Sequence, residues 1–146
     1  MFEKYLKRYS KREVPLHAPS AEEWDKMETE LNFHFPPEYR VFVDEAVAVY
    51  FEGEIPVCGV DRQGGWLNIL LRERGDSDSC IPMSLIPFCG VGNGDYHCFR
   101  RTDMPIDGYD IVYWDHEVGS DFLAAPESWL ADSFSEWLIG YSEDRF

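Results

Sequence analysis

The chain has 146 residues, of which 45% are hydrophobic and 16% aromatic, and its formal net charge is −15. This length and composition fit one globular domain with an aromatic core and exclude a disordered or low-complexity chain. The first twelve residues hold five bases and one acid, whereas the remaining 134 hold eight bases and 27 acids, a net −19. Such a body repels nucleic acid and anionic membranes and attracts a basic protein, although acidic surface also serves solubility alone.

The cysteines and the hydropathy pattern indicate where the protein resides. No Cys-x-x-Cys pair occurs, which disfavours a zinc or thioredoxin-like site, and buried reduced thiols are favoured over disulfides. No segment approaches the roughly 20 apolar residues of a membrane span, and the basic N-terminus lacks the apolar run of a signal peptide. We therefore expect a cytoplasmic protein that binds neither nucleic acid nor membrane.

The first half of the chain is predicted to be helical. Apolar residues at helical spacing predict a short amphipathic helix within residues 2–9, and a proline-containing linker follows over 14–19. Ser20 and Glu23 have capping-box spacing and predict a helix whose apolar face holds Ala21, Trp24, Met27 and Leu31. Pro36-Pro37 predicts the start of another helix, which ends near Gly53. Its apolar positions follow the strongest periodic pattern in the chain: Tyr39, Phe42, Val43, Ala46, Val47 and Tyr50.

The second half changes character and predicts an antiparallel meander followed by a helix. Strands are expected at Ile55–Val60, Trp66–Leu71, Leu85–Cys89, Tyr96–Arg101 and Tyr109–Trp114. A final helix starts at Ser128 or Ser133, since both can serve as caps. This order predicts an α+β domain over residues 1–146, with an N-terminal helix and linker (1–19) and a main body (20–146).

Gly90–Gly94 resembles a phosphate-binding loop only in composition. It lacks the Gly-Lys-Ser/Thr sequence, and it connects two predicted strands, whereas a phosphate loop needs a helix N-terminus behind it. A hairpin turn is the favoured interpretation.

A cluster of acids and histidines offers an alternative site. Asp95 and His97 share one face of a predicted strand, and hairpin pairing with the next strand brings Asp95 near Asp115 and His116. These four residues define a hypothetical metal-dependent hydrolase. The competing interpretation is acids at a sheet end. Cys98 faces away from His97 on the same strand, so a Cys–His catalytic pair is not expected.

Three local patterns, in order, resemble the Smi1/Knr4 (SUKH) family. The first is Phe35-Pro36-Pro37-Glu38-Tyr39-Arg40-Val41-Phe42-Val43 at a helix start. The second is Ile86-Pro87-Phe88 followed by Gly90-Val91-Gly92-Asn93-Gly94-Asp95-Tyr96. The third is Ile111-Val112-Tyr113-Trp114-Asp115-His116-Glu117 with Ser133-Phe134-Ser135-Glu136-Trp137-Leu138. The resemblance spans roughly residues 21–141 and leaves the first twenty outside.

The resemblance implies an antiparallel or mixed sheet of about five to six strands flanked by helices. It also implies a protein-binding role without catalytic residues, cofactor or metal, as in bacterial immunity proteins against nuclease or deaminase toxins and in fungal regulatory scaffolds. We expect a monomer or weak dimer that binds a basic toxin domain through acidic loops and an aromatic anchor. The expected contact residues are Glu52, Glu54, Asp76, Asp78, Asp115, Glu117, Asp121 and Phe122.

Overall fold

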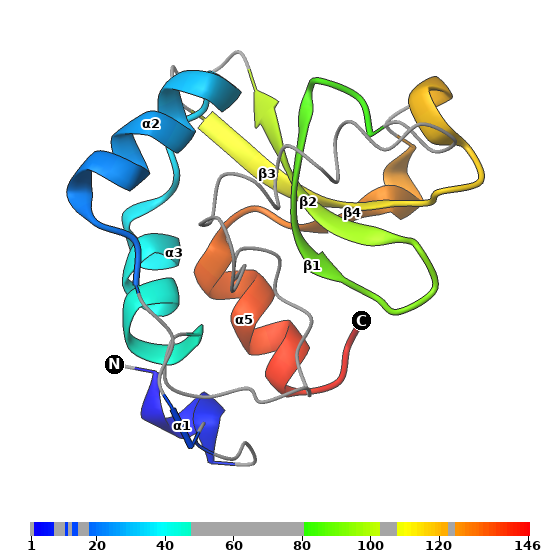
Figure 1. Cartoon of the computed structure of the whole chain (residues 1–146). Helices are drawn as coiled ribbons and strands as arrows, with labels where there is room; N and C mark the ends of the chain where they lie inside the picture. Colours follow the sequence, from blue (N-terminus) through cyan, green and yellow to red (C-terminus); the bar gives the residue numbers. More distant parts are fainter. Residues whose placement is uncertain are drawn as a thin grey trace.

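The computed structural model describes residues 2–7, 11, 13–14, 18–47, 81–102, 108–122 and 125–146. Within these residues a four-stranded antiparallel sheet, in the order β1-β2-β3-β4, carries α-helices on one face (Figure 1). Its elements are α1 (Glu3–Leu6), α2 (Ala21–Leu31), α3 (Pro37–Phe42), the π-helix η1 (Val43–Val47), β1 (Leu85–Gly90), β2 (Tyr96–Thr102), β3 (Gly108–Trp114), the 3₁₀ turns η2 (Gly119–Asp121) and η3 (Pro126–Ser128), β4 (Trp129–Ala131) and α5 (Phe134–Ser142).

The capping box predicted for α2 is confirmed. The Glu23 backbone N–H donates to Ser20 Oγ at 3.2 Å, and the Ser20 backbone N–H donates to Glu23 Oε1 at 3.2 Å. Trp24, Met27 and Leu31 are buried as the periodicity predicts, but Ala21 is exposed because the first turn lies outside the core. The helix ends at Asn32, whose left-handed backbone (φ 48°) turns the chain toward α3.

The helix predicted after Pro36-Pro37 begins as expected, with Pro37 in the first turn. Four of its apolar positions, Tyr39, Phe42, Val43 and Ala46, are buried. From Val43 the backbone changes to a π-helix, which the apolar periodicity does not predict. The expected positions Tyr50 and Gly53 lie outside the described residues.

The three later strands of the meander are confirmed, and β2 and β3 pair from Tyr96↔Trp114 to Thr102↔Gly108. The strands expected at 55–60 and 66–71 lie outside the described residues. β4 was not predicted, because three residues before a helix give too short a pattern. The described sheet therefore has four strands, whereas about five to six were expected.

Alternation along the strands gives the sheet two apolar faces. Phe88 and Phe99 stack at 4.4 Å on the face covered by the helices, where they meet Tyr39 and Phe134. Each ring buried there contributes about 2–3 kcal/mol. The opposite face holds a second cluster: Ile81, Leu85, Cys98, Val112 and Trp114.

The last helix, α5, is capped by Ser133, which settles the alternative with Ser128. The Glu136 backbone N–H donates to Ser133 Oγ at 3.1 Å, whereas Ser128 ends η3. Phe134, Trp137 and Leu138 are buried against the main core.

Cys89 and Cys98 are buried free thiols on adjacent strands, and they pack into the two different apolar clusters. Burial raises the pKa of Cys89 to about 12. This thiol therefore stays protonated at neutral pH, as expected for structural cysteines. Cys58 and Cys80 lie outside the described residues.

Candidate functional site

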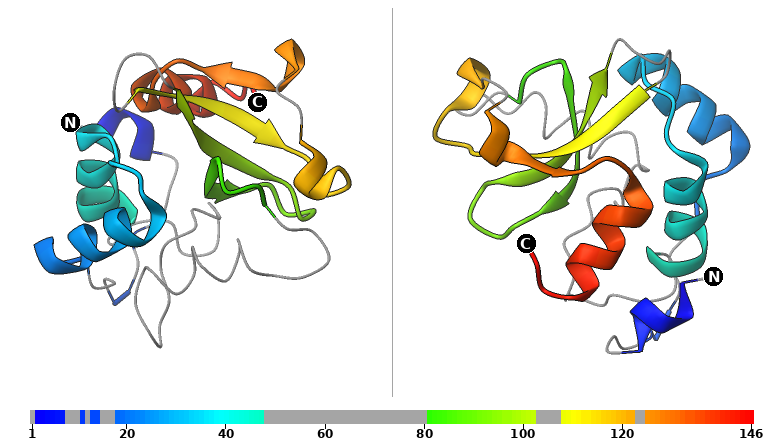
Figure 2. Two further views of the ribbon diagram at one scale, coloured as in Figure 1. Left: turned by 90° about the horizontal axis from the view of Figure 1, so that it is seen from above. Right: turned by 180° about the vertical axis from the view of Figure 1, so that it is seen from behind.

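The candidate site is one end of the sheet, which we call the hairpin end: residues 91–95 between β1 and β2, and residues 115–122 after β3. Figures 1 and 2 show that both segments leave the end of the sheet away from α2 and diverge beyond it. The pairing of Tyr96 with Trp114 brings them together, since Asp95 and Asp115 are the next residues outward. The predicted proximity of Asp95 and Asp115 is thereby confirmed.

Asp95 is buried and serves as the organising carboxylate of the hairpin end. Its Oδ1 accepts the His116 backbone N–H at 2.9 Å and the His116 Nδ1–H at 2.6 Å. Its Oδ2 accepts the Tyr113 hydroxyl and the Asn93 side-chain amide. Burial alone would raise the pKa of Asp95, but the hydrogen bonds from Tyr113, His116 and Asn93 outweigh it and lower the pKa to about 2.

The glycine-rich segment is the turn of this hairpin, as predicted. Gly92 and Gly94 have φ values of +96° and +101°, which side-chain-bearing residues rarely adopt. The segment leads into β2 and not into a helix. A phosphate loop is therefore not formed here.

The four residues of the hypothetical hydrolase do not form one site. Asp95, Asp115 and His116 each place a ligand atom within 4.8 Å of the others. His97 instead lies in the core, where its Nδ1 accepts the Trp137 indole N–H at 2.9 Å. Burial lowers the pKa of His97 to about 4, so the ring is neutral at pH 7.

The trio fits a cation poorly. Both oxygens of Asp95 are occupied by N–H and O–H donors from the protein itself, and a metal ion would have to displace them. The hydrogen bond that His116 Nδ1–H donates to Asp95 raises the pKa of His116, and this bond needs the proton that a metal-bound Nδ1 must lose. We therefore interpret Asp95, Asp115 and His116 as residues that stabilise the turn.

Exposed acids follow in the segment after β3. The Asp115 side chain is 48% exposed, and Glu117 and Asp121 are exposed as well. Phe122, the expected aromatic anchor, is only partly exposed because it packs against the second apolar cluster. The other expected contact residues lie outside the described residues: Glu52, Glu54, Asp76 and Asp78.

Two apolar side chains at the hairpin end were missed by sequence reasoning. Val91 is 44% exposed and Val118 is 43% exposed. Each is a single valine within a turn, so no periodic pattern marks it in the sequence. Trp129 is 44% exposed at the start of β4. Its indole N–H donates to Asp132. The hairpin end thus combines carboxylates with small apolar patches.

A comparison with known protein families identifies the family to which this chain belongs. The family model described as "SMI1-KNR4 cell-wall" (SUKH_5) matches residues 1–141. The chain belongs to the SMI1-KNR4 (SUKH) family. The match includes the first twenty residues, which the local motifs did not reach. No curated protein matches the chain.

The motifs that carry the SUKH resemblance lie on defined elements. The proline motif opens α3, the Ile86-Pro87-Phe88 motif is in β1, the glycine motif is the β1–β2 turn, and the closing motif caps and forms α5. Among the described residues, none of the helices has the length and apolar character required to cross a membrane.

Proposed function

We propose that this SUKH domain is a non-catalytic immunity protein, which neutralises a basic nuclease- or deaminase-type toxin by binding it directly through the hairpin end. The observation that carries the proposal is the group of exposed carboxylates of Asp115, Glu117 and Asp121 on the segment that follows β3, in a protein of net charge −15. A basic partner is attracted to such a surface over a distance of about a Debye length. The protein would act in the cytoplasm of the cell that makes it, as a monomer or weak dimer.

The mechanism would be stoichiometric occlusion. Carboxylates on residues 115–121 occupy the positions that substrate phosphates take in the active site of a nuclease. The exposed side chains of Val118, on the same segment, and of Val91, on the β1–β2 turn, would supply apolar contact. Charged groups then set the association rate and the choice of partner, while the desolvated apolar contacts slow dissociation.

The chemistry of the candidate side chains favours binding over catalysis. The carboxylate of Asp95 is committed to four donors, and the imidazole of His97 is buried against Trp137. The thiol of Cys89 is buried with a pKa of about 12. A general base or nucleophile needs an accessible group with a pKa near neutrality, and these three side chains lack that combination.

Affinity capture of the tagged protein from its native cells tests the proposal. The expected result is a near-stoichiometric basic protein that is toxic when produced alone and harmless when produced with this chain. Its affinity should fall at least about tenfold as the salt concentration rises from 0.05 to 0.5 M. A toxin complex with salt-independent affinity contradicts the electrostatic mechanism, and a capture without any toxic partner contradicts the immunity function.

A regulatory scaffold is the second candidate function. It is favoured by the "cell-wall" description of the matching family. In that case the captured proteins belong to signalling or cell-envelope pathways, and none of them is toxic alone.

A further inference from the structure

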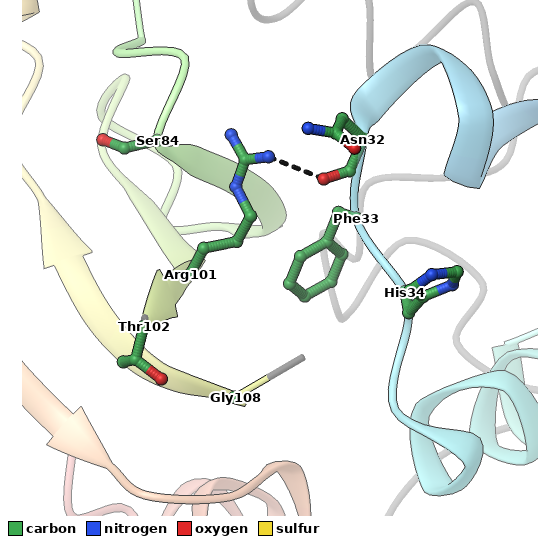
Figure 3. Close-up of a pocket in the computed structure, with 7 residues that line it drawn as sticks. All are labelled: Asn32, Phe33, His34, Ser84, Arg101, Thr102 and Gly108. Atoms are coloured by element: carbon green, nitrogen blue, oxygen red, sulfur yellow. Dashed lines mark hydrogen bonds between the residues drawn. The ribbon is translucent and has the colours of Figure 1, made fainter. Parts of the chain in front are cut away.

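A pocket of about 470 Å³ lies at the other end of the β2–β3 hairpin, roughly 20 Å from the hairpin end along seven strand residues (Figure 3). It opens between the segment that follows α2 and the ends of β2 and β3, and it is lined by Asn32, Phe33, His34, Ser84, Arg101, Thr102 and Gly108. Its volume is in the range of small-molecule sites.

The guanidinium of Arg101 is held in place at this pocket by two backbone carbonyls. Nη1 donates to the Asn32 carbonyl at 2.6 Å, and Nη2 donates to the Met83 carbonyl at 3.1 Å. The left-handed conformation of Asn32 helps to aim its carbonyl toward the strand. Carbonyl groups orient the guanidinium without neutralising it, so the positive charge is fixed in position before any ligand arrives.

Arg101 differs from two other arginines nearby. Arg100 forms a two-pronged pair with Asp110, and Arg40 pairs with Glu28 at 3.3 Å. Within the described part of the chain, Arg101 contacts carbonyls but no carboxylate. An arginine that lacks an acidic partner is notable in a chain with 28 acids and 13 bases.

Several donors around the pocket remain available. Arginine carries five N–H donors, and two are engaged by carbonyls, so three remain on Arg101. The side chains of Ser84 and Thr102 also line the pocket, but their hydroxyls point away from the guanidinium (Figure 3). The ring of Phe33, stacked on Phe99 at 5.5 Å, provides a rigid apolar wall. The combination of one fixed cation and an apolar wall suits an anionic group attached to a small apolar body.

We infer that this pocket binds a carboxylate, held by the guanidinium of Arg101 beside the apolar wall of Phe33. A planar carboxylate matches the fork of a guanidinium and accepts two parallel N–H bonds from it. A phosphate is disfavoured because its second charge meets the repulsion of a body with net charge −15, while Arg101 supplies one compensating charge. The carboxylate belongs either to a small free acid or to the C-terminus of a peptide. This inference does not depend on the proposed function.

Titration of the ¹⁵N-labelled full chain, followed by NMR at constant ionic strength, tests the inference. The probes are acetate, inorganic phosphate, an N-acetylated tetra-alanine with a free C-terminal carboxylate, and the same peptide as its C-terminal amide. Saturable shifts of the Arg101 Nε–H and of the Ser84 and Thr102 amides are expected with acetate and the free-acid peptide. Tighter binding of acetate indicates a small free acid, whereas tighter binding of the peptide indicates a chain terminus.

Matched variants complete the test. Arg101→Lys keeps the charge but removes the fork, and it should weaken carboxylate binding about tenfold. Arg145→Lys, at a solvent-exposed pair with Glu143, should leave it unchanged. The comparison of acetate with phosphate on the wild type keeps the test valid if Arg101→Lys fails to fold. Three results would overturn the inference: no saturable shift with either carboxylate probe, phosphate binding tighter than acetate, or a folded Arg101→Lys variant that binds carboxylate as tightly as the wild type.

Discussion

Acidification should destabilise this protein through one buried histidine. His97 is 4% exposed, and its Nδ1 accepts the Trp137 indole N–H at 2.9 Å. Protonation of Nδ1 turns an acceptor into a donor that faces another donor. The protonated ring is also surrounded by the rings of Tyr113, Tyr141 and Phe146, which cannot replace the lost hydration of a charge.

The size of the effect follows from the pKa. The pKa of His97 is lowered from 6.5 to about 4, so the unfolded chain binds a proton more readily than the folded one. The stability contributed by neutral His97 is therefore complete above pH 6.5 and is lost as the pH falls through 4. One pKa unit is worth about 1.4 kcal/mol, which gives a total loss of about 3 kcal/mol, most of it by pH 4.5. A domain of this size is stable by only about 5–15 kcal/mol.

Urea unfolding at a series of pH values, followed by tryptophan fluorescence, measures this loss. His97→Gln keeps an oxygen acceptor for Trp137 but does not titrate. We expect the free energy of unfolding of the wild type to fall by about 2–3 kcal/mol more than that of His97→Gln between pH 7.5 and 4.5. Acids that titrate in this range do so in both proteins, so the difference isolates His97.

His116→Gln is the matched control. The hydrogen bond that His116 donates to Asp95 raises the pKa of His116, so the stability that this histidine contributes is present at low pH and is lost as the pH rises. Removing it should make the acid-induced loss steeper, the opposite of the effect of His97→Gln. Equal losses in wild type and His97→Gln would refute the assignment of His97 as a buried neutral acceptor.

Three further predictions concern the hairpin and the sheet. Asp95→Ala removes the acceptor of four hydrogen bonds and should lower the free energy of unfolding, measured in urea, by about 2–3 kcal/mol at pH 7. This difference from the wild type should disappear between pH 4 and 2, because the Asp95 carboxyl of the wild type is protonated there. Gly94→Ala should cost more stability in thermal unfolding than Gly92→Ala, because both have positive φ but only the added Cβ at residue 94 meets a side chain, at 3.2 Å. Cys89 and Cys98 should react with a thiol reagent only as fast as the protein unfolds, and rapid labelling in native buffer would contradict their burial. Mass spectrometry of the native protein should show no disulfide between them.

Local patterns predicted the elements of this fold well because each depends on neighbours in sequence. Ser20 and Glu23 specify a cap within one turn, and Pro37 fixes the start of α3 by its own ring. Hairpin pairing of the strands at 96–101 and 109–114 predicted that Asp95 meets Asp115, and the register that pairs Tyr96 with Trp114 confirms it. The π-helix after Phe42 was missed because it shares its apolar positions with an α-helix.

The details of the sites were less predictable because they depend on contacts between distant residues. The bond between Trp137 and His97 joins residues 40 positions apart, and it removed His97 from the hypothetical metal site. Arg101 reaches Asn32 across 69 positions, so no sequence pattern marks the pocket. Exposed acids, by contrast, follow from composition, which is why Asp115, Glu117 and Asp121 were expected at the surface.

The central claim is that the acids of the hairpin end, and not acidity in general, bind the partner. Two triple variants separate these possibilities: Asp115→Asn/Glu117→Gln/Asp121→Asn at the hairpin end, and Glu22→Gln/Asp25→Asn/Glu30→Gln on the exposed face of α2. Each removes three negative charges, so the whole-protein charge changes equally.

The decisive measurement is the affinity of the captured partner for the two triple variants and the wild type, determined by calorimetry at 0.15 M salt. Three partly desolvated charge contacts are worth about 1 kcal/mol each, so we predict at least a hundredfold loss of affinity for the hairpin-end variant and less than about threefold for the α2 variant. Equal losses in the two variants, or no loss in either, would contradict the account.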